Sequence, residues 1–265
     1  KARPRIAMLA HIDTVGLMVT GVDGHGALRV GPVGRPMIDS LIGQVVAVHT
    51  RAGPISGVVF RTNDGGTRAD VGDIAIDCGF ADQAKAAGAV RPGDYVTWAA
   101  PSRELADGRL AAPGADDRLG VFVICQTLLA VAEAGDDGPA VSAVSCIQEE
   151  GPTHLGAITT MSRVKPDLII VVDTASAGDA DGGDASFRLA GGPIIARGGS
   201  VHNRTSDSLI ELAESLGLPF QIEPIGRGSG TDLESAIQFA GGNAVGCLVS
   251  IPQRHSHTPA EVFDP

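Results

Sequence analysis

Short apolar runs of strand length alternate with helical patterns through the second part of the chain, and this alternation constrains the fold more than any other feature. The runs at 141–147, 168–172 and 244–251 are almost continuously apolar, as strands are when both faces of their sheet are buried. Residues 119–134 and 206–216 instead have helical spacing, and Ser206 with Asp207 provides a cap for the second helix. We therefore predict an α/β domain in which helices cover a sheet.

The stretch from about Val22 to Pro113 has a different composition. It is rich in Gly, Val and Pro, and it contains short alternating strands at 44–50, 55–60 and 94–98. Turn signals separate these strands, which is typical of a small β-barrel. Because candidate site residues lie on both sides of this stretch, we expect the barrel to be an insertion. The predicted domains are a discontinuous catalytic domain, 1–21 plus 113–265, and an inserted barrel, 22–112.

Residue types that bind metals follow the predicted strands of the catalytic domain. His11 and Asp13 end the apolar run 6–10, and residues two apart in a strand share a face. Open α/β sheets bind ligands at the carboxyl edge of their strands, where such side chains would meet. Two histidines with three carboxylates suit two zinc-like ions that share one carboxylate. The candidate residues of this two-metal hydrolase site are His11, Asp13, Asp116, Glu149, Glu150, Asp173 and His257.

Each of these motifs also has a simpler explanation. Two adjacent glutamates are commonly a solvated pair, and Asp116 with Asp117 could cap the helix that follows them. Asp173 could form a turn, and His257 could be an exposed loop residue. Their ordered recurrence at successive strand ends favours the metal-site hypothesis.

Charge and hydropathy exclude several classes of partner. The net charge is −11, which argues against nucleic acid because phosphate binding needs clustered Lys and Arg. No apolar run is long enough to cross a bilayer. The four cysteines lie singly in apolar stretches, so we expect small buried side chains in a reducing, cytoplasmic location.

At the candidate site residues, the sequence resembles the tetrahedral (TET-type) aminopeptidase family, which includes glutamyl aminopeptidases and proteins once labelled endoglucanases. This family belongs to the clan of dinuclear zinc exopeptidases (clan MH). The resemblance covers nearly the whole chain in order. Its main segments are Ala10-His11-Ile12-Asp13-Thr14-Val15-Gly16, Ala115-Asp116-Asp117-Arg118-Leu119-Gly120, Gln148-Glu149-Glu150, Val172-Asp173, Gly230-Thr231-Asp232 and Ile251-Pro252-Gln253-Arg254-His255-Ser256-His257-Thr258-Pro259.

The resemblance implies a mixed-sheet, phosphorylase/hydrolase-like catalytic domain with an inserted barrel that serves in dimer contacts. It further implies small peptide substrates and homo-oligomers from dimers to hollow dodecamers. By resemblance, one ion is held by His11, Asp116 and Asp173, and the other by Asp116, Glu150 and His257. Glu149 would be the general base acting on a metal-bridged water, and Asp13 the partner of His11. Zinc is the first choice of metal, with cobalt and manganese open.

Two departures from the family pattern keep other functions open. Gly151 to Ala157 replaces the usual Gly-x-Arg-Gly-Ala turn and brings His154 near the predicted site, and His255 replaces an expected aromatic residue. Our leading hypothesis is a metal-dependent aminopeptidase that removes N-terminal residues from peptides. The altered turn motivates an alternative, a metal-dependent deacylase of small N-acyl amino acids. A non-catalytic interaction protein is the third hypothesis, which the loss of a ligand would have favoured, and no ligand is lost.

Overall fold

The computed structural model describes residues 3–63, 66–135, 138–178 and 187–265. It contains two compact units. The first unit comprises Lys1–Asp13, Ala115–Ser256 and Val262–Pro265, and the second comprises Thr14–Gly114 and His257–Glu261. The predicted domain boundaries differ from these units mainly at 14–21 and 257–261, which lie in the second unit.

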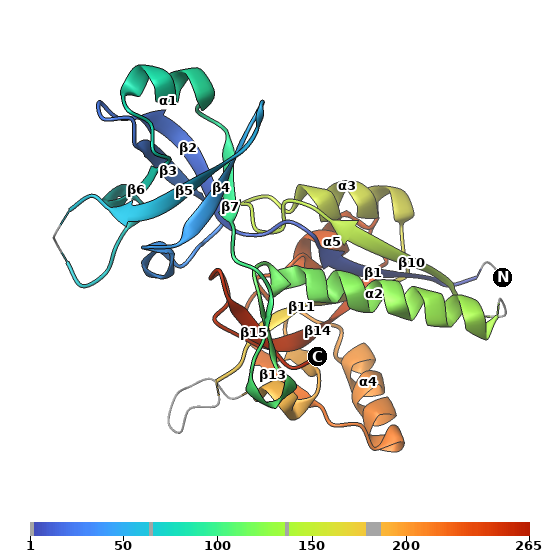
Figure 1. Cartoon of the computed structure of the whole chain (residues 1–265). Helices are drawn as coiled ribbons and strands as arrows, with labels where there is room; N and C mark the ends of the chain where they lie inside the picture. The colour runs from blue at the N-terminus through green and yellow to red at the C-terminus, as the bar shows by residue number, and fades with distance from the viewer. Residues whose placement is uncertain (1–2, 64–65, 136–137, 179–186) are drawn as a thin grey trace. The chain divides into compact units, whose positions relative to one another are not determined.

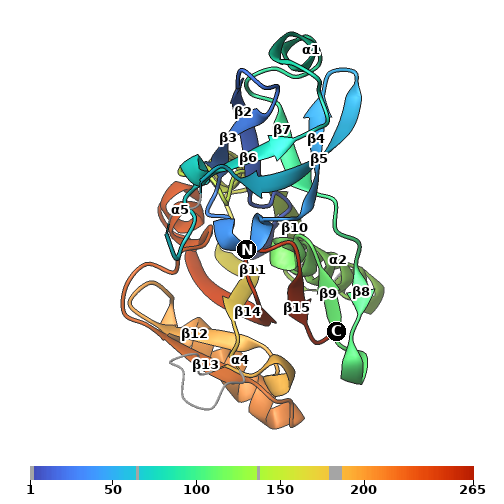
Figure 2. The same ribbon diagram turned by 60° about the vertical axis from the view of Figure 1, so that its left-hand side comes forward.

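The first unit contains a mixed sheet (Figure 2). Its strands β10, β1, β11 and β14 are parallel neighbours in that order, whereas β15 runs antiparallel to β14. Strand β12 pairs antiparallel with β14 and parallel with β13. The strands are β10 (Ala140–Cys146), β1 (Arg5–His11), β11 (Leu168–Ser176), β14 (Val245–Arg254), β15 (Glu261–Phe263), β12 (Ile194–Gly198) and β13 (Gln221–Ile225). The predicted α/β class with a mixed sheet is confirmed.

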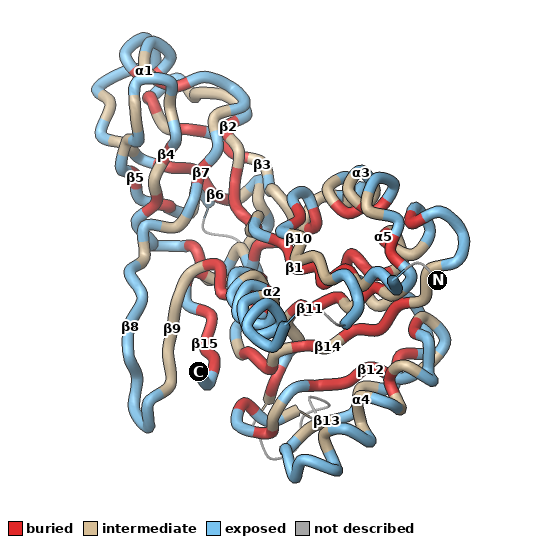
Figure 3. Tube along the Cα trace, turned by 90° about the vertical axis from the view of Figure 1, so that its right-hand side faces the viewer, coloured by how far each residue is buried: buried red, intermediate tan, exposed pale blue. Residues whose placement is uncertain are grey.

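Alternation along β1 explains why both faces of this sheet are covered. Leu9 packs into one core cluster with residues of α3 (Leu155–Val164) and α5 (Leu233–Phe239). Met8 packs into the other with Ile124 of α2 (Ala115–Ala134). Helices α3 and α5 therefore lie on one face of the sheet and α2 lies on the other (Figure 1). Strands β1, β11 and β14 are buried along much of their length (Figure 3), as their continuous apolar sequences predict.

Element boundaries differ from the sequence-based predictions in two places that matter. Strand β11 continues to Ser176, because its pairing with β14 extends that far, so Asp173 lies inside the strand and not at its end. Helix α4 (Asn203–Leu216) begins before the predicted cap. The cap prediction is wrong because Ser206 is fully buried within the helix, whose N-cap is His202.

The second unit contains a closed antiparallel barrel, which confirms the predicted barrel. Leu17, Leu28, Val48 and Ile76 are fully buried and contribute to its core. A short helix, α1 (Gln83–Ala89), connects β6 to β7. A hairpin of β8 (Arg103–Glu104) and β9 (Leu110–Ala112) follows β7. The barrel order is β2 (Gly16–Val22), β3 (Leu28–Val33), β6 (Ile74–Asp77), β5 (Gly53–Arg61), β4 (Val45–Thr50) and β7 (Tyr95–Trp98).

The four cysteines are free thiols. Cys146 and Cys247 are buried, as predicted, and Cys78 is half-buried. The prediction of burial is wrong for Cys125, which is exposed on α2. Across the described residues, the helices are all too short or too polar to cross a membrane.

Candidate functional site

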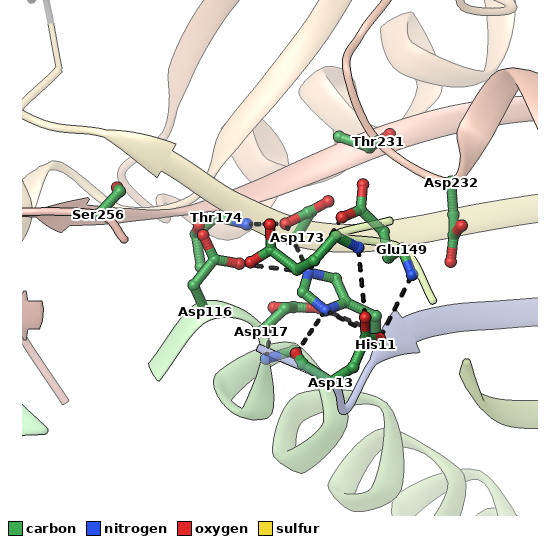
Figure 4. A network of polar contacts seen from close by, with 12 residues as sticks. His11, Asp13, Asp116, Asp117, Glu149, Asp173, Thr174, Thr231, Asp232 and Ser256 are labelled. Atoms are coloured by element: carbon green, nitrogen blue, oxygen red, sulfur yellow. Dashed lines mark hydrogen bonds and ion pairs between the residues drawn. The ribbon is translucent and has the colours of Figure 1, made fainter. Parts of the chain in front are cut away.

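His11 ends β1 and lies at the centre of the polar network in the first unit (Figure 4). Its side chain is 2% exposed. Its Nδ1 lies 3.0 Å from the backbone oxygen of Asp13, and its Nε2 lies 3.3 Å from Asp116 Oδ1 and 3.7 Å from Asp173 Oδ1. Because a carbonyl oxygen only accepts, Nδ1–H is the donor in this hydrogen bond. In the neutral ring Nε2 then carries the lone pair, and it faces the carboxylates.

Asp13 contributes to the site in a way that the His11-Asp13 spacing does not reveal. Its backbone carbonyl, rather than its carboxylate, makes the hydrogen bond to His11. The carboxylate instead accepts the backbone N–H of Glu149 at Oδ1 and that of Glu150 at Oδ2, each at 3.3 Å. Asp13 therefore orients the His11 ring with one group and holds the glutamate pair with another.

The two aspartates at the start of α2 have different surroundings. Asp116 faces His11, whereas Asp117 holds the backbone around the site. Asp117 is fully buried, and its carboxylate accepts the N–H of His11 at 3.2 Å and that of Gly120 at 3.0 Å. It thereby caps α2 and ties the helix to β1. Asp116 presents Oδ1 to His11, while its Oδ2 accepts a hydrogen bond from Gln253 Nε2 at 3.3 Å.

Gly120 provides a test of this support. A Cβ at Gly120 would clash with both carboxylate oxygens of Asp117, which cannot move without losing its buried hydrogen bonds. We expect Gly120→Ala to lower the free energy of unfolding by about 1–3 kcal/mol in a urea titration. Gly88 is the matched control, since it lies in helix α1 with open space around its Cβ position. Gly88→Ala should raise stability by about 0.5–1 kcal/mol, and equal effects of the two changes would contradict the clash.

Glu149 lies between two histidines. Its carboxylate is largely buried, with Oε2 3.8 Å from His11 Nε2 and Oε1 3.8 Å from His154 Nδ1. His154 Nδ1 in turn lies 3.1 Å from Asp232 Oδ1. The turn that differs from the family pattern therefore places His154 beside Glu149.

The carboxylates around His11 lie close together with little access to water, and this raises their pKa values. Burial raises the pKa of Glu149 to about 9, and the charge of Asp173 adds to the rise. Burial raises the pKa of Glu150 to about 8, with a further contribution from Asp116. Burial alone would lower the pKa of His11, but its contacts with Asp116 and Asp173 outweigh that effect and raise the pKa overall. A bound cation would relieve this repulsion among the acids.

His257 belongs to the second unit, where its local contacts are well defined. Its backbone N–H donates to Glu261 Oε1 at 2.8 Å, and its Nδ1 lies 3.0 Å from the backbone oxygen of Arg35. As with His11, the carbonyl partner makes Nδ1–H the donor, which leaves Nε2 as the ring nitrogen that could bind a metal.

The chemistry of the donor atoms fits a divalent metal ion. One ring nitrogen of His11 and one carboxylate oxygen each from Asp116 and Asp173 all lie within 4.8 Å of one another. All three residues are buried, and a nitrogen with two carboxylate oxygens is a donor set that zinc, cobalt and manganese accept. The orienting hydrogen bond at Nδ1 is also what metal-binding histidines commonly have.

Sequence reasoning did not assign roles to two buried polar residues of this region. Gln253 is fully buried and donates to Asp116 and to Ser256 Oγ, the latter at 3.0 Å. Asp232 is 2% exposed and pairs with His154. A polar residue within an apolar strand, and an aspartate just before a helix, were the signals available.

Comparison with known proteins extends over the whole chain. The sequence profile of the M42 glutamyl aminopeptidase family matches residues 1–265. Lysyl aminopeptidase of Pyrococcus furiosus is 28% identical, over 98% of this chain and 77% of the relative. The TET aminopeptidase of Thaumarchaeota archaeon SCGC AB-539-E09 has a TM-score of 0.90 and 26% identity, over 99% of this chain and 77% of that chain. The Pyrococcus horikoshii TET1 peptidase, which can assemble into a tetrahedron or a large octahedral shell, has a TM-score of 0.83 and 25% identity, over 99% and 79%.

These matches define the class of protein as a peptidase, and therefore a hydrolase, whose relatives are aminopeptidases. The chain belongs to the M42 glutamyl aminopeptidase family. The resemblance to TET-type aminopeptidases that the motifs indicated is thereby confirmed. Peptidases of this family depend on metals, and the cluster of His11, Asp116 and Asp173 fits that requirement.

Proposed function

We propose that this protein is an aminopeptidase that uses two divalent metal ions to remove N-terminal residues from small peptides. The observation that carries the proposal is the buried group of His11, Asp116 and Asp173, with Glu149 beside it. Membership in an aminopeptidase family supports the same activity.

The ligand sets in this proposal are those that the resemblance to TET-type aminopeptidases implies. His11, Asp116 and Asp173 hold one ion, and Asp116, Glu150 and His257 hold the other. Zinc is the expected metal, with cobalt and manganese as alternatives. When bound, the ions would polarise the scissile carbonyl and allow a water molecule to give up a proton near neutral pH.

The remaining chemistry belongs to side chains of this chain. Glu149 accepts the proton from the attacking water and then donates it to the leaving amine. Burial raises the pKa of Glu149, and bound cations would lower it again toward neutral pH, where one group can both take and return a proton. Asp13 fixes the backbone at Glu149 through the hydrogen bond to its N–H. Glu149 Oε2 lies 3.8 Å from His11 Nε2.

Assembly into larger particles is part of the proposal. The Pyrococcus horikoshii TET1 peptidase can assemble into a tetrahedron or a large octahedral shell, and its fold matches 99% of this chain. We propose that this protein also forms homo-oligomers, with the barrel in the dimer contact. A cytoplasmic location stays a prediction from the unpaired cysteines.

A panel of chromogenic substrates tests the activity. Chelator-stripped protein is reconstituted with zinc, cobalt or manganese and assayed on aminoacyl-p-nitroanilides and on their N-acetylated counterparts. We expect metal-dependent cleavage of the free-amine substrates only. Cleavage confined to the acetylated compounds would replace the aminopeptidase by the deacylase, and no cleavage with any metal would favour the non-catalytic hypothesis.

A further inference from the structure

We propose that His154 and Asp232 form a positioning pair that holds Glu149 in place for proton transfer, an inference that rests on the proposed function. The sequence motifs that contain these two residues did not indicate a role for either of them. His154 departs from the family turn, and Asp232 lies 78 residues further along the chain. The structure joins them by a hydrogen bond of 3.1 Å between Nδ1 and Oδ1.

Both residues lie at the start of a helix. His154 is the N-cap of α3 and Asp232 is the N-cap of α5, yet neither side chain caps its own helix. An aspartate at an N-cap ordinarily accepts a backbone N–H of the first turn. Here the two side chains pair with each other instead, across two helices that pack together.

The burial of Asp232 restricts the movement of the His154 ring that is hydrogen-bonded to it. Asp232 is 2% exposed, and within the described part of the chain its Oδ2 is buried without a hydrogen-bond partner. Removing His154 would therefore leave the buried carboxylate without the ring donor, which is costly in a low-dielectric interior. Asp232 in this way fixes the ring of His154 firmly.

The same ring nitrogen faces both carboxylates, and this decides what His154 can do. Nδ1 lies 3.1 Å from Asp232 Oδ1 but 3.8 Å from Glu149 Oε1, which is too long for a hydrogen bond. A proton relay through the ring would need the two carboxylates on different nitrogens. His154 is therefore not a shuttle between them, and its Nδ1–H is committed to Asp232.

What remains is control of the Glu149 side chain. His11 lies next to one carboxylate oxygen of Glu149 and His154 next to the other, each at 3.8 Å. The turn between Glu150 and His154 is short, and the hydrogen bond to Asp232 fixes its far end. Without the His154 ring, Glu149 could rotate away from His11, and a misplacement of about 1 Å can cost roughly 100-fold in rate.

Two variants of His154 distinguish the effect of its side-chain N–H from the effect of its backbone conformation. His154 has φ 48°, a left-handed conformation that Asn tolerates and Gly adopts readily. His154→Asn keeps an N–H near the position of Nδ1, whereas His154→Gly keeps only the backbone. We expect His154→Gly to lower kcat about 10- to 100-fold with KM and metal content unchanged, and His154→Asn to restore most of kcat. His202→Gly, at the N-cap of α4, is the matched control and should leave kcat unchanged.

The outcomes distinguish this inference from the proposed function. Unchanged kcat in His154→Gly, or equal losses in the Gly and Asn variants, would overturn the positioning pair while metal-dependent activity of the wild type stands. Inactive wild type would overturn the proposed function, and the pairing itself is then judged by imidazole ¹⁵N NMR. We expect His154 in the Nδ1–H form, changed in Asp232→Ala. An Nε2–H tautomer in the wild type would overturn the pair.

Discussion

Replacing Glu149 by Gln is expected to lower kcat on the order of 10⁴-fold, because one carboxylate serves as base in the first proton transfer and as acid in the second. Gln keeps the size of the side chain but can neither accept nor donate that proton at neutral pH. Since Glu149 is not one of the proposed ligands, metal content and KM should stay close to those of the wild type. Steady-state kinetics on the preferred p-nitroanilide, with metal analysis of the same sample, gives all three values.

The neighbouring glutamate supplies the control for this experiment. Glu150 is half-buried and also has a raised pKa, and its backbone N–H donates to the other carboxylate oxygen of Asp13. As a proposed ligand, Glu150→Gln should lower metal content as well as activity. If Glu149→Gln loses metal while Glu150→Gln retains it, the two roles are exchanged. If Glu149→Gln stays active, it is not the base.

Removing Asp116 is expected to abolish most of the stabilisation that metal gives. Its carboxylate is the one that the proposal assigns to both ions, so Asp116→Ala deprives each ion of a ligand. Ligand excess of about 1,000 times Kd stabilises a folded protein by about 4 kcal/mol. For a unit of this size that corresponds to a rise in Tm of roughly 10 °C on adding zinc to the stripped wild type. The variant should show little of this rise.

Thermal melts of stripped and zinc-loaded protein, run side by side, measure this difference. Glu133→Ala is the control, because it removes one carboxylate from the exposed part of the same helix. The stripped proteins are compared as well, because Asp116→Ala removes one negative charge from the acidic cluster but also takes away the acceptor of buried Gln253 Nε2. A zinc-induced shift of full size in Asp116→Ala would refute its place in both ligand sets.

The parallel strands and the long helix could be predicted because their sequences depend on few distant partners. Strands buried on both faces are continuously apolar, and β11 and most of β14 have such sequences. The expectation of a buried strand is wrong for β10, which lies at the edge of the sheet, has two serines and buries only Cys146. Helix α3 was not predicted, since Gly156 and Thr159 weaken its intrinsic preference and His154 begins it without capping it. Packing on the sheet through Ala157 and Met161 stabilises this helix instead.

The structure brings together His11, Asp116 and Asp173, which the sequence singled out, but the separate roles of the side chains around them could not be read from the sequence. The sequence placed His11 and Asp13 together, because alternate strand residues share a face. It could not show that Asp13 orients His11 with its carbonyl and holds Glu149 with its carboxylate, since both arrangements have the same spacing. The pairing of His154 with Asp232 depends on how α3 and α5 pack, which no local pattern records.

The closure of the barrel affects how the rest of the chain reaches its own fold. Leu17, near the start of β2, pairs with Val96 of β7, so the first and last strands of the barrel are direct neighbours. Before the barrel forms, the segment from Thr14 to Gly114 is one long loop that must close when β1 meets α2. A folded barrel shortens that loop several-fold and, by the logarithmic dependence on length, lowers the entropic cost of closing it by on the order of 1 kcal/mol. The first unit then bears only the entropic cost of ordering the short segments that lead into and out of the barrel.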